Sequence, residues 1–151
     1  MDKIFETAIF NRKVLVNYIK ELTHQQLITI PANFNNSIFW NIAHTLVTQQ
    51  LLIYRLSGLP LNIKSDIIEK YTKGSKATKH ISKEEIEYVK SKLISTIVKT
   101  QEDYNQGLFK HYDPYLTSVD ISLNNIDDAL KFSAFHDGIH LGVILSLKKL
   151  V

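Results

Sequence analysis

The chain has 151 residues, of which 44% are hydrophobic and 22% charged, with five Gly, three Pro, no Cys and a formal net charge of +3. This composition excludes a disordered, fibrous or loop-rich chain, and a length near ~150 residues allows a core that folds without disulfides or a structural metal. Because Cys is absent, any metal must be held by nitrogen or oxygen atoms.

The first predicted helix begins near the amino terminus and buries one face. Its apolar residues recur at spacings of three, four or seven, namely Ile4, Ala8, Leu15, Ile19 and Leu22. The start of the chain has no basic segment followed by an apolar one, so we expect no secretory signal and a cytoplasmic protein.

A second helix is predicted from Ile38 to about Ser57. Either Asn36 or Ser37 can cap its start, and Gly58 and Pro60 follow its end. Apolar residues cover most of its circumference, so we expect it to be central. The uncharged stretch from residue 22 to residue 54 contains too many Asn and Gln residues for a membrane span, and no membrane association is predicted.

The next segment carries six lysines between Lys64 and Lys83. Asp66 and Glu69 interrupt them, and Tyr71 is the single aromatic residue among them. A nucleic-acid site is expected to interleave basic residues with aromatic ones for base stacking. The pattern therefore favours a solvated loop, and we expect no nucleic-acid partner.

Two further helices complete the predicted chain. The third opens at Ser82 with a capping-box pattern and continues to Gly107, and the fourth begins near Asn125 and ends near Lys148. Residues 117–123 between them alternate apolar and polar side chains, but without an evident partner strand they are interpreted as an extended linker.

Four helices without a sheet predict an all-α fold, a four-helix bundle. The connection from Gly58 to Ile81 is long for a hairpin between antiparallel helices, so at least one long crossover connection is expected. With no repeat and no change of composition along the sequence, residues 1–151 are predicted to form a single helical domain.

Three of the six histidines form a candidate metal site. His136 and His140 are four residues apart, so both imidazoles project from one face of the fourth helix, and His44 lies on an apolar face of the second. Buried imidazoles are costly without partners. If the two faces meet, three nitrogen ligands converge and leave a fourth position for water or substrate; alternatively, His44 bonds a backbone carbonyl and the pair lies in a wet crevice.

Neighbouring residues are assigned weaker roles by spacing alone. Asn41 and Thr48 are candidates to support His44, as are Asp137 or Tyr104 if packing brings them near, although ordinary polar contacts would explain each of them. Trp40 and Phe132 either wall a pocket or form plain core, Gly138 and Gly142 favour close packing of another helix, and His24, His80 and His111 are left out of the site.

The residues that carry these features resemble a known family. Residues 36–44, the sequence Gly58-Leu59-Pro60 and residues 136–142 are similar to the DinB-like superfamily of four-helix metalloproteins. His44, His136, His140 and Gly142 match its motif in order. The resemblance implies a divalent metal ion (Zn, Ni or Fe) and a homodimer. The characterised members of this family are mostly transferases or isomerases that use a thiol such as bacillithiol, mycothiol or glutathione, so the resemblance also implies a thiol-dependent activity.

The resulting hypothesis is a metal-dependent enzyme that activates a small thiol in an S-transferase type of reaction. Its substrate would be a small molecule, and no catalytic residue beyond the three metal ligands is identified. Two alternatives remain open: a metal-dependent hydrolase, or a noncatalytic helical dimer module with a structural or vestigial metal site.

Overall fold

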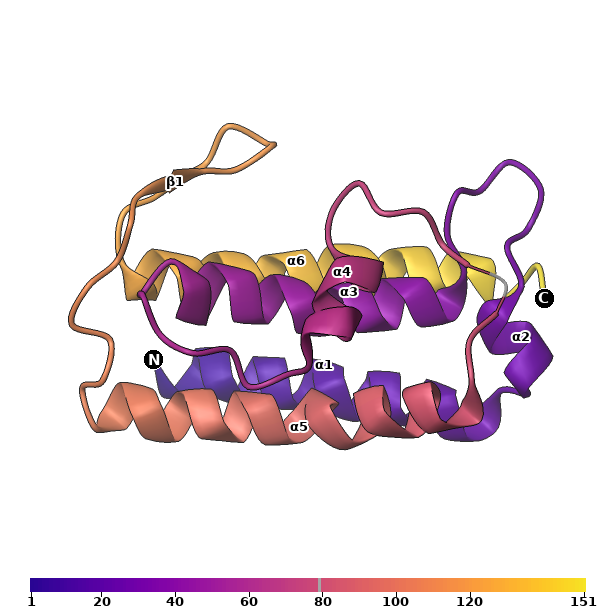
Figure 1. Ribbon diagram of the computed structural model, residues 1–151, viewed down its shortest axis with the longest axis horizontal. Helices are drawn as coiled ribbons and strands as arrows, with labels where there is room; N and C mark the ends of the chain where they lie inside the picture. The colour runs from indigo at the N-terminus through magenta and orange to yellow at the C-terminus, as the bar shows by residue number, and fades with distance from the viewer. Residues whose placement is uncertain (79) are drawn as a thin grey trace.

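The structure is a computed structural model, and it describes residues 1–78 and 80–151 (Figure 1). It confirms the predicted all-α bundle. Four long helices form it, and short elements connect them. The long helices are α1 (Asp2–Glu21), α3 (Ile38–Gln50), α5 (Lys83–Asn105) and α6 (Ile126–Leu147); the short ones are α2 (His24–Ile28), α4 (Ser65–Tyr71) and the π-helix η1 (Leu51–Arg55), which continues α3.

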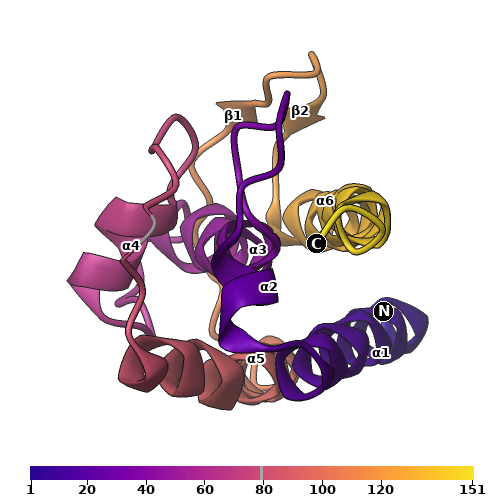
Figure 2. The ribbon, with the colours of Figure 1, turned by 90° about the vertical axis from the view of Figure 1, so that its right-hand side faces the viewer.

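The connectivity contains the predicted long crossover. In Figure 1, α1 and α6 run in one direction along the bundle while α3 and α5 run in the other. The parallel helices α3 and α5 are therefore joined by a connection that returns along the bundle and includes α4. Figure 2 shows α4 outside the ring of long helices, where it packs against α3.

The central helix α3 is the most completely buried element. Ser37 caps it by accepting a hydrogen bond from the amide of Trp40, and all but one of its 13 residues are buried. It packs against α5 and α6, while α1 packs against α5 and α6 from the other side. The prediction of a central second helix is confirmed. Within the described ranges, no helix combines the length and the hydropathy that a bilayer span requires.

The lysine-rich segment is only partly the loop that the sequence predicted, since its described residues after Tyr71 are irregular up to the start of α5. Residues 65–71 form α4, and its apolar side chains Ile67 and Tyr71 are 2% and 0% exposed. Two apolar residues one turn apart are too short a pattern to show a helix among lysines. Lys79, which belongs to the same predicted loop, lies outside the described residues.

The predicted linker at residues 117–123 contains half of a small hairpin. Strand β1 (Tyr115–Leu116) pairs antiparallel with β2 (Ser122–Leu123), and Tyr115 lies opposite Leu123. The partner strand immediately precedes the segment, and at two residues it is too short to recognise by alternation. Asp120 adopts φ 58° in the turn, a left-handed conformation that Asp tolerates.

A buried ion pair joins three of the long helices. Arg12 of α1 is 0% exposed, and its Nε and Nη2 atoms donate to the two carboxylate oxygens of Asp137 on α6 at 3.0 and 3.2 Å. Nη2 also donates to the carbonyl oxygen of Thr45 on α3 at 2.9 Å. Burial raises the pKa of the Asp137 carboxyl, and the guanidinium opposes this change. The Arg12 ion pair therefore couples α1 to both helices that carry the histidines.

We expect Arg12→Met to lower the free energy of unfolding by about 3–5 kcal/mol, because it leaves the Asp137 carboxylate buried without its partner. Urea denaturation would measure the loss. The adjacent exposed variant Lys13→Met should change stability by less than about 0.5 kcal/mol. The double variant with Asp137→Leu should recover most of the loss. Equal stability of the Arg12 and Lys13 variants would contradict the role of the pair.

Candidate metal centre

Helices α3 and α6 bring three histidines to one place. His44 of α3 and the pair His136 and His140 of α6 each offer one ring nitrogen, and these atoms lie within 4.8 Å of one another. The His44 ring centroid is 5.2 Å from that of His136 and 4.8 Å from that of His140. The faces of the two helices therefore meet, although binding of a metal by these residues stays a prediction.

The hydrogen bonds of two imidazoles fix which ring nitrogen carries the proton. His44 Nδ1 lies 2.7 Å from the carbonyl oxygen of Tyr71, which can only accept, so Nδ1 donates and Nε2 keeps a lone pair. The Asn41 amide nitrogen donates to the Ser37 carbonyl, so its Oδ1 atom accepts from His140 Nδ1 at 2.8 Å. His140 Nε2 therefore also keeps its lone pair.

The third imidazole completes a donor set that fits a divalent ion. His136 Nε2 lies 3.2 Å from His140 Nε2. Two nitrogens bound at 2.0–2.1 Å to a tetrahedral ion would be about 3.3 Å apart. The other ring nitrogen of His136, Nδ1, is buried and has no hydrogen-bond partner among the described residues. Zinc, nickel and iron all accept imidazole nitrogen, so the residues present fit the group that the sequence predicted.

Burial also keeps these rings neutral, as ligation requires. It lowers the pKa of His136 to about 3 and that of His140 to about 4, and the neighbouring imidazoles add a charge repulsion that acts in the same direction. Burial lowers the pKa of His44 as well, and the positive charge of Lys73 contributes to that decrease. The three rings are therefore uncharged near neutral pH, and each has one ring nitrogen with a lone pair.

Of the four candidate supporting residues, two contact the imidazoles. Asn41 orients His140, and the Thr48 hydroxyl lies 3.3 Å from His44 Nε2 and donates to it. Asp137 instead faces Arg12, and Tyr104 donates to Asp127 at 2.8 Å, so the suggestion that these two join the site is wrong. The expectation that His44 bonds a backbone carbonyl is confirmed at Tyr71, although the residue pattern does not indicate which carbonyl accepts.

Aromatic residues cover two of the rings. Trp40 stacks on His44 with ring centroids 4.6 Å apart and an interplanar angle of 13°. Phe132 lies 6.4 Å from His136, centroid to centroid, and lines the adjacent cavity. Phe132 therefore forms part of the cavity wall, whereas Trp40 covers His44 from within the core and does not line the cavity.

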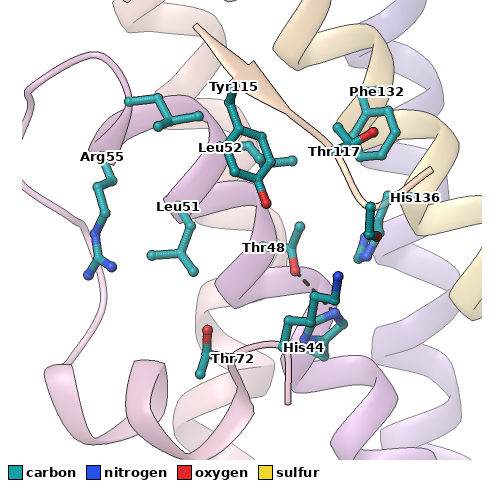
Figure 3. Close-up of a pocket in the computed structure, with 13 residues that line it drawn as sticks. His44, Thr48, Leu51, Leu52, Arg55, Thr72, Tyr115, Thr117, Phe132 and His136 are labelled. Carbon is teal, nitrogen blue, oxygen red and sulfur yellow. Dashed lines mark hydrogen bonds between the residues drawn. The ribbon is translucent and has the colours of Figure 1, made fainter. Parts of the chain in front are cut away.

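A cavity of about 260 Å³ opens beside the imidazoles (Figure 3). It is reached by His44 and His136, while the third imidazole does not line it. Its walls are largely apolar, and come from η1, from the segment after α4 and from the hairpin. The other lining residues are Thr48, Leu51, Leu52, Arg55, Leu56, Thr72, Lys73, Tyr115, Thr117, Ser118 and Phe132. A π-helical turn often marks a functional site, and here it supplies one wall.

The histidines and glycines that were predicted to lie outside the site have the following contacts. His24 bonds the Ile81 carbonyl and His111 bonds Asp113, so neither joins the cluster. Among the described residues of this chain, no other helix packs closely at Gly138 or Gly142, since a Cβ atom at either position would meet nothing within 4 Å. Both glycines lie on an exposed face of α6 that also carries the exposed side chains of Phe135, Ile139 and Leu145. The homodimer stays a prediction.

Comparison with known proteins adds one finding. The family model described as the DinB superfamily matches residues 9–144, which include all three histidines. No curated protein matches the chain.

The neutral imidazoles predict that the metal-free protein loses stability in acid. An unfolded histidine binds a proton as the pH falls through 6.5, whereas folded His136 and His140 do so near 3 and 4. Below pH 6.5 these two histidines therefore bind more protons in the unfolded state, and their contribution lowers the free energy of unfolding. This contribution is constant above pH 6.5.

Urea unfolding in the presence of a chelator, at several values between pH 4 and pH 6.5, would test this expectation. His136→Gln should show a shallower decrease than the wild type. His111→Gln, which removes an exposed imidazole, should keep the wild-type dependence. Indistinguishable slopes for all three proteins would contradict it.

Proposed function

The chain belongs to the DinB superfamily, and on this basis we propose that it is a metal-dependent enzyme that activates a small thiol at His44, His136 and His140. One observation carries the proposal. Three imidazoles held neutral by burial, two of them with their proton fixed on the outer nitrogen, meet at the side of a cavity. A metal site that only stabilises the fold would not require a cavity beside its ligands.

The chain's own residues supply position and protonation state. Tyr71 and Asn41 each accept the Nδ1 proton of an imidazole, which turns the ring and directs its Nε2 lone pair to the common point. A divalent ion held by three neutral ligands keeps its full charge and lowers the pKa of a thiol or water that reaches it.

The lining of the cavity favours thiol transfer over hydrolysis. Among the described residues, no Asp or Glu lines the cavity, so no carboxylate is placed to serve as the general acid or base of a hydrolase. The chain has no Cys either, so a sulfur nucleophile must come from a cosubstrate. In the proposed reaction a C–S bond forms, the bond from carbon to the leaving group breaks with its electron pair, and the thiol proton passes to solvent.

The size of the cavity supports a small-molecule substrate. Its volume of about 260 Å³ suits a small molecule, and its largely apolar walls would cover part of the substrate. Phe132 and the leucines of η1 supply these walls, so an electrophile with an apolar body is the expected partner of the thiol.

The test begins with metal content. Protein purified without an affinity tag should contain about one equivalent of a divalent metal, and His44→Ala and His136→Ala should lose it, whereas His111→Ala should not. Asn41→Leu removes the acceptor that orients His140, so we expect zinc affinity to fall by about 10- to 100-fold. Elemental analysis and zinc titration measure these quantities, and unchanged metal content in both His→Ala variants would exclude the site.

The same variants test the activity. Zinc-loaded protein should accelerate chloride release from 1-chloro-2,4-dinitrobenzene by small thiols such as cysteine or glutathione, and the His44→Ala and His136→Ala proteins should give only the zinc-free rate. Replacing the thiol by an alcohol of the same shape should abolish the acceleration. Metal-dependent ester cleavage without any thiol would instead support the hydrolase.

A further inference from the structure

Two exposed cationic side chains line the cavity, and neither has a negative partner among the described residues. Arg55 comes from the last residue of η1, and Lys73 follows α4 by two residues. Across residues 1–78 and 80–151, neither side chain makes an ion pair, whereas Lys70 near Lys73 pairs with Glu85 at 2.6 Å. The cavity lining contains no described Asp or Glu. An anion in the cavity would therefore meet positive charge only.

The two cations lie at different places relative to the imidazoles. Lys73 is close enough to His44 for its charge to affect that ring. In the view of Figure 3, Arg55 lies beyond Leu51, on the other side from His44 and His136. Leu51, an apolar residue of the cavity lining, lies between the two imidazoles and Arg55 in that view.

The π-helical turn accounts for the place of Arg55. The amide of Leu56 donates to the carbonyl of Leu51, five residues back, and both of these leucines line the cavity together with Arg55. The arginine stem can lie along this apolar wall while its charged head stays hydrated at the edge. A guanidinium presents a fork of N–H groups that matches a carboxylate or a phosphate.

We propose that the cavity binds an anionic small molecule whose carboxylate or phosphate group is held by Arg55, with Lys73 as a second cation nearer the imidazoles. The apolar body of the molecule lies against Leu51 and Phe132, and its other end points to the three histidines. The reacting role of that end rests on the proposed function, whereas recognition of the anion does not.

The test compares two molecules of the same shape and different charge. Phenylacetate and phenylacetamide are titrated into the full-length protein, once with a chelator and once with zinc, and binding is followed by NMR shifts of the backbone amides. The wild type should bind phenylacetate at least about tenfold more tightly than the amide in both conditions. Equal affinities, or no binding of either molecule, would overturn the proposal.

Variants then locate the anion. Arg55→Gln should weaken phenylacetate binding by about tenfold, Arg55→Lys should recover part of it, and Lys73→Gln should weaken it to a smaller degree. Lys13→Gln changes the net charge equally at an exposed site outside the cavity and should have no effect. Unchanged melting temperatures would show that each variant is folded. Wild-type affinity in Arg55→Gln would overturn the proposal.

Further arms separate the sources of the signal. Phenylphosphonate in place of phenylacetate shows whether the site prefers a phosphate-like group or a carboxylate. Binding that requires zinc and ignores Arg55→Gln would mean that the carboxylate ligates the metal, which would overturn this inference and leave the proposed function intact. Anion binding that depends on Arg55 in a protein that takes up no zinc would support this inference and overturn the proposed function.

Discussion

A buried guanidinium fixes the two helices that carry the histidines. Arg12 contacts Asp137, which directly follows His136, and the carbonyl of Thr45, which directly follows His44. Consecutive residues of a helix project about 100° apart, so holding residue 137 toward α1 turns His136 away from α1 and toward α3. The same contact holds the backbone of α3 one residue from His44. Because a buried charge without a partner is costly, few other arrangements of the three helices are available to this sequence.

The second constraint is the polar content of α3, since almost every residue of this helix is buried. Each polar side chain requires a partner, and the partners come from different elements. Gln49 donates to Thr100 of α5 at 2.8 Å, and Asn41 accepts from His140 of α6. His44 donates to Tyr71, the last residue of α4, whose carbonyl has no partner within its own short helix. The crossover that joins α3 to α5 therefore supplies an acceptor that the imidazole needs.

The sequence predicts what is periodic and local. The long helices follow from apolar spacing and caps at Ser37, Ser82 and Asn125, and the histidine pair follows from a separation of four residues. Contacts between distant residues leave no comparable signal. Arg12 and Asp137 are 125 residues apart, and nothing in either neighbourhood indicates the other. The helix α4 and the hairpin strand β1 are too short for a period to be recognised, and glycine spacing alone does not show whether a face is covered.

In the proposed enzyme, the three metal ligands and the residues that would contact the substrate come from different parts of the chain. The three imidazoles project from long helices held by the core and by the Arg12 ion pair, and metal ligands require positions defined to about 0.5 Å. The walls that a substrate would meet come from η1, from the segment that follows α4 and from the hairpin. Connecting segments tolerate substitution better than a packed helix does, because fewer neighbours depend on each side chain. Changes there, at Arg55 or Tyr115 for example, would alter which molecule binds while the imidazoles keep their geometry.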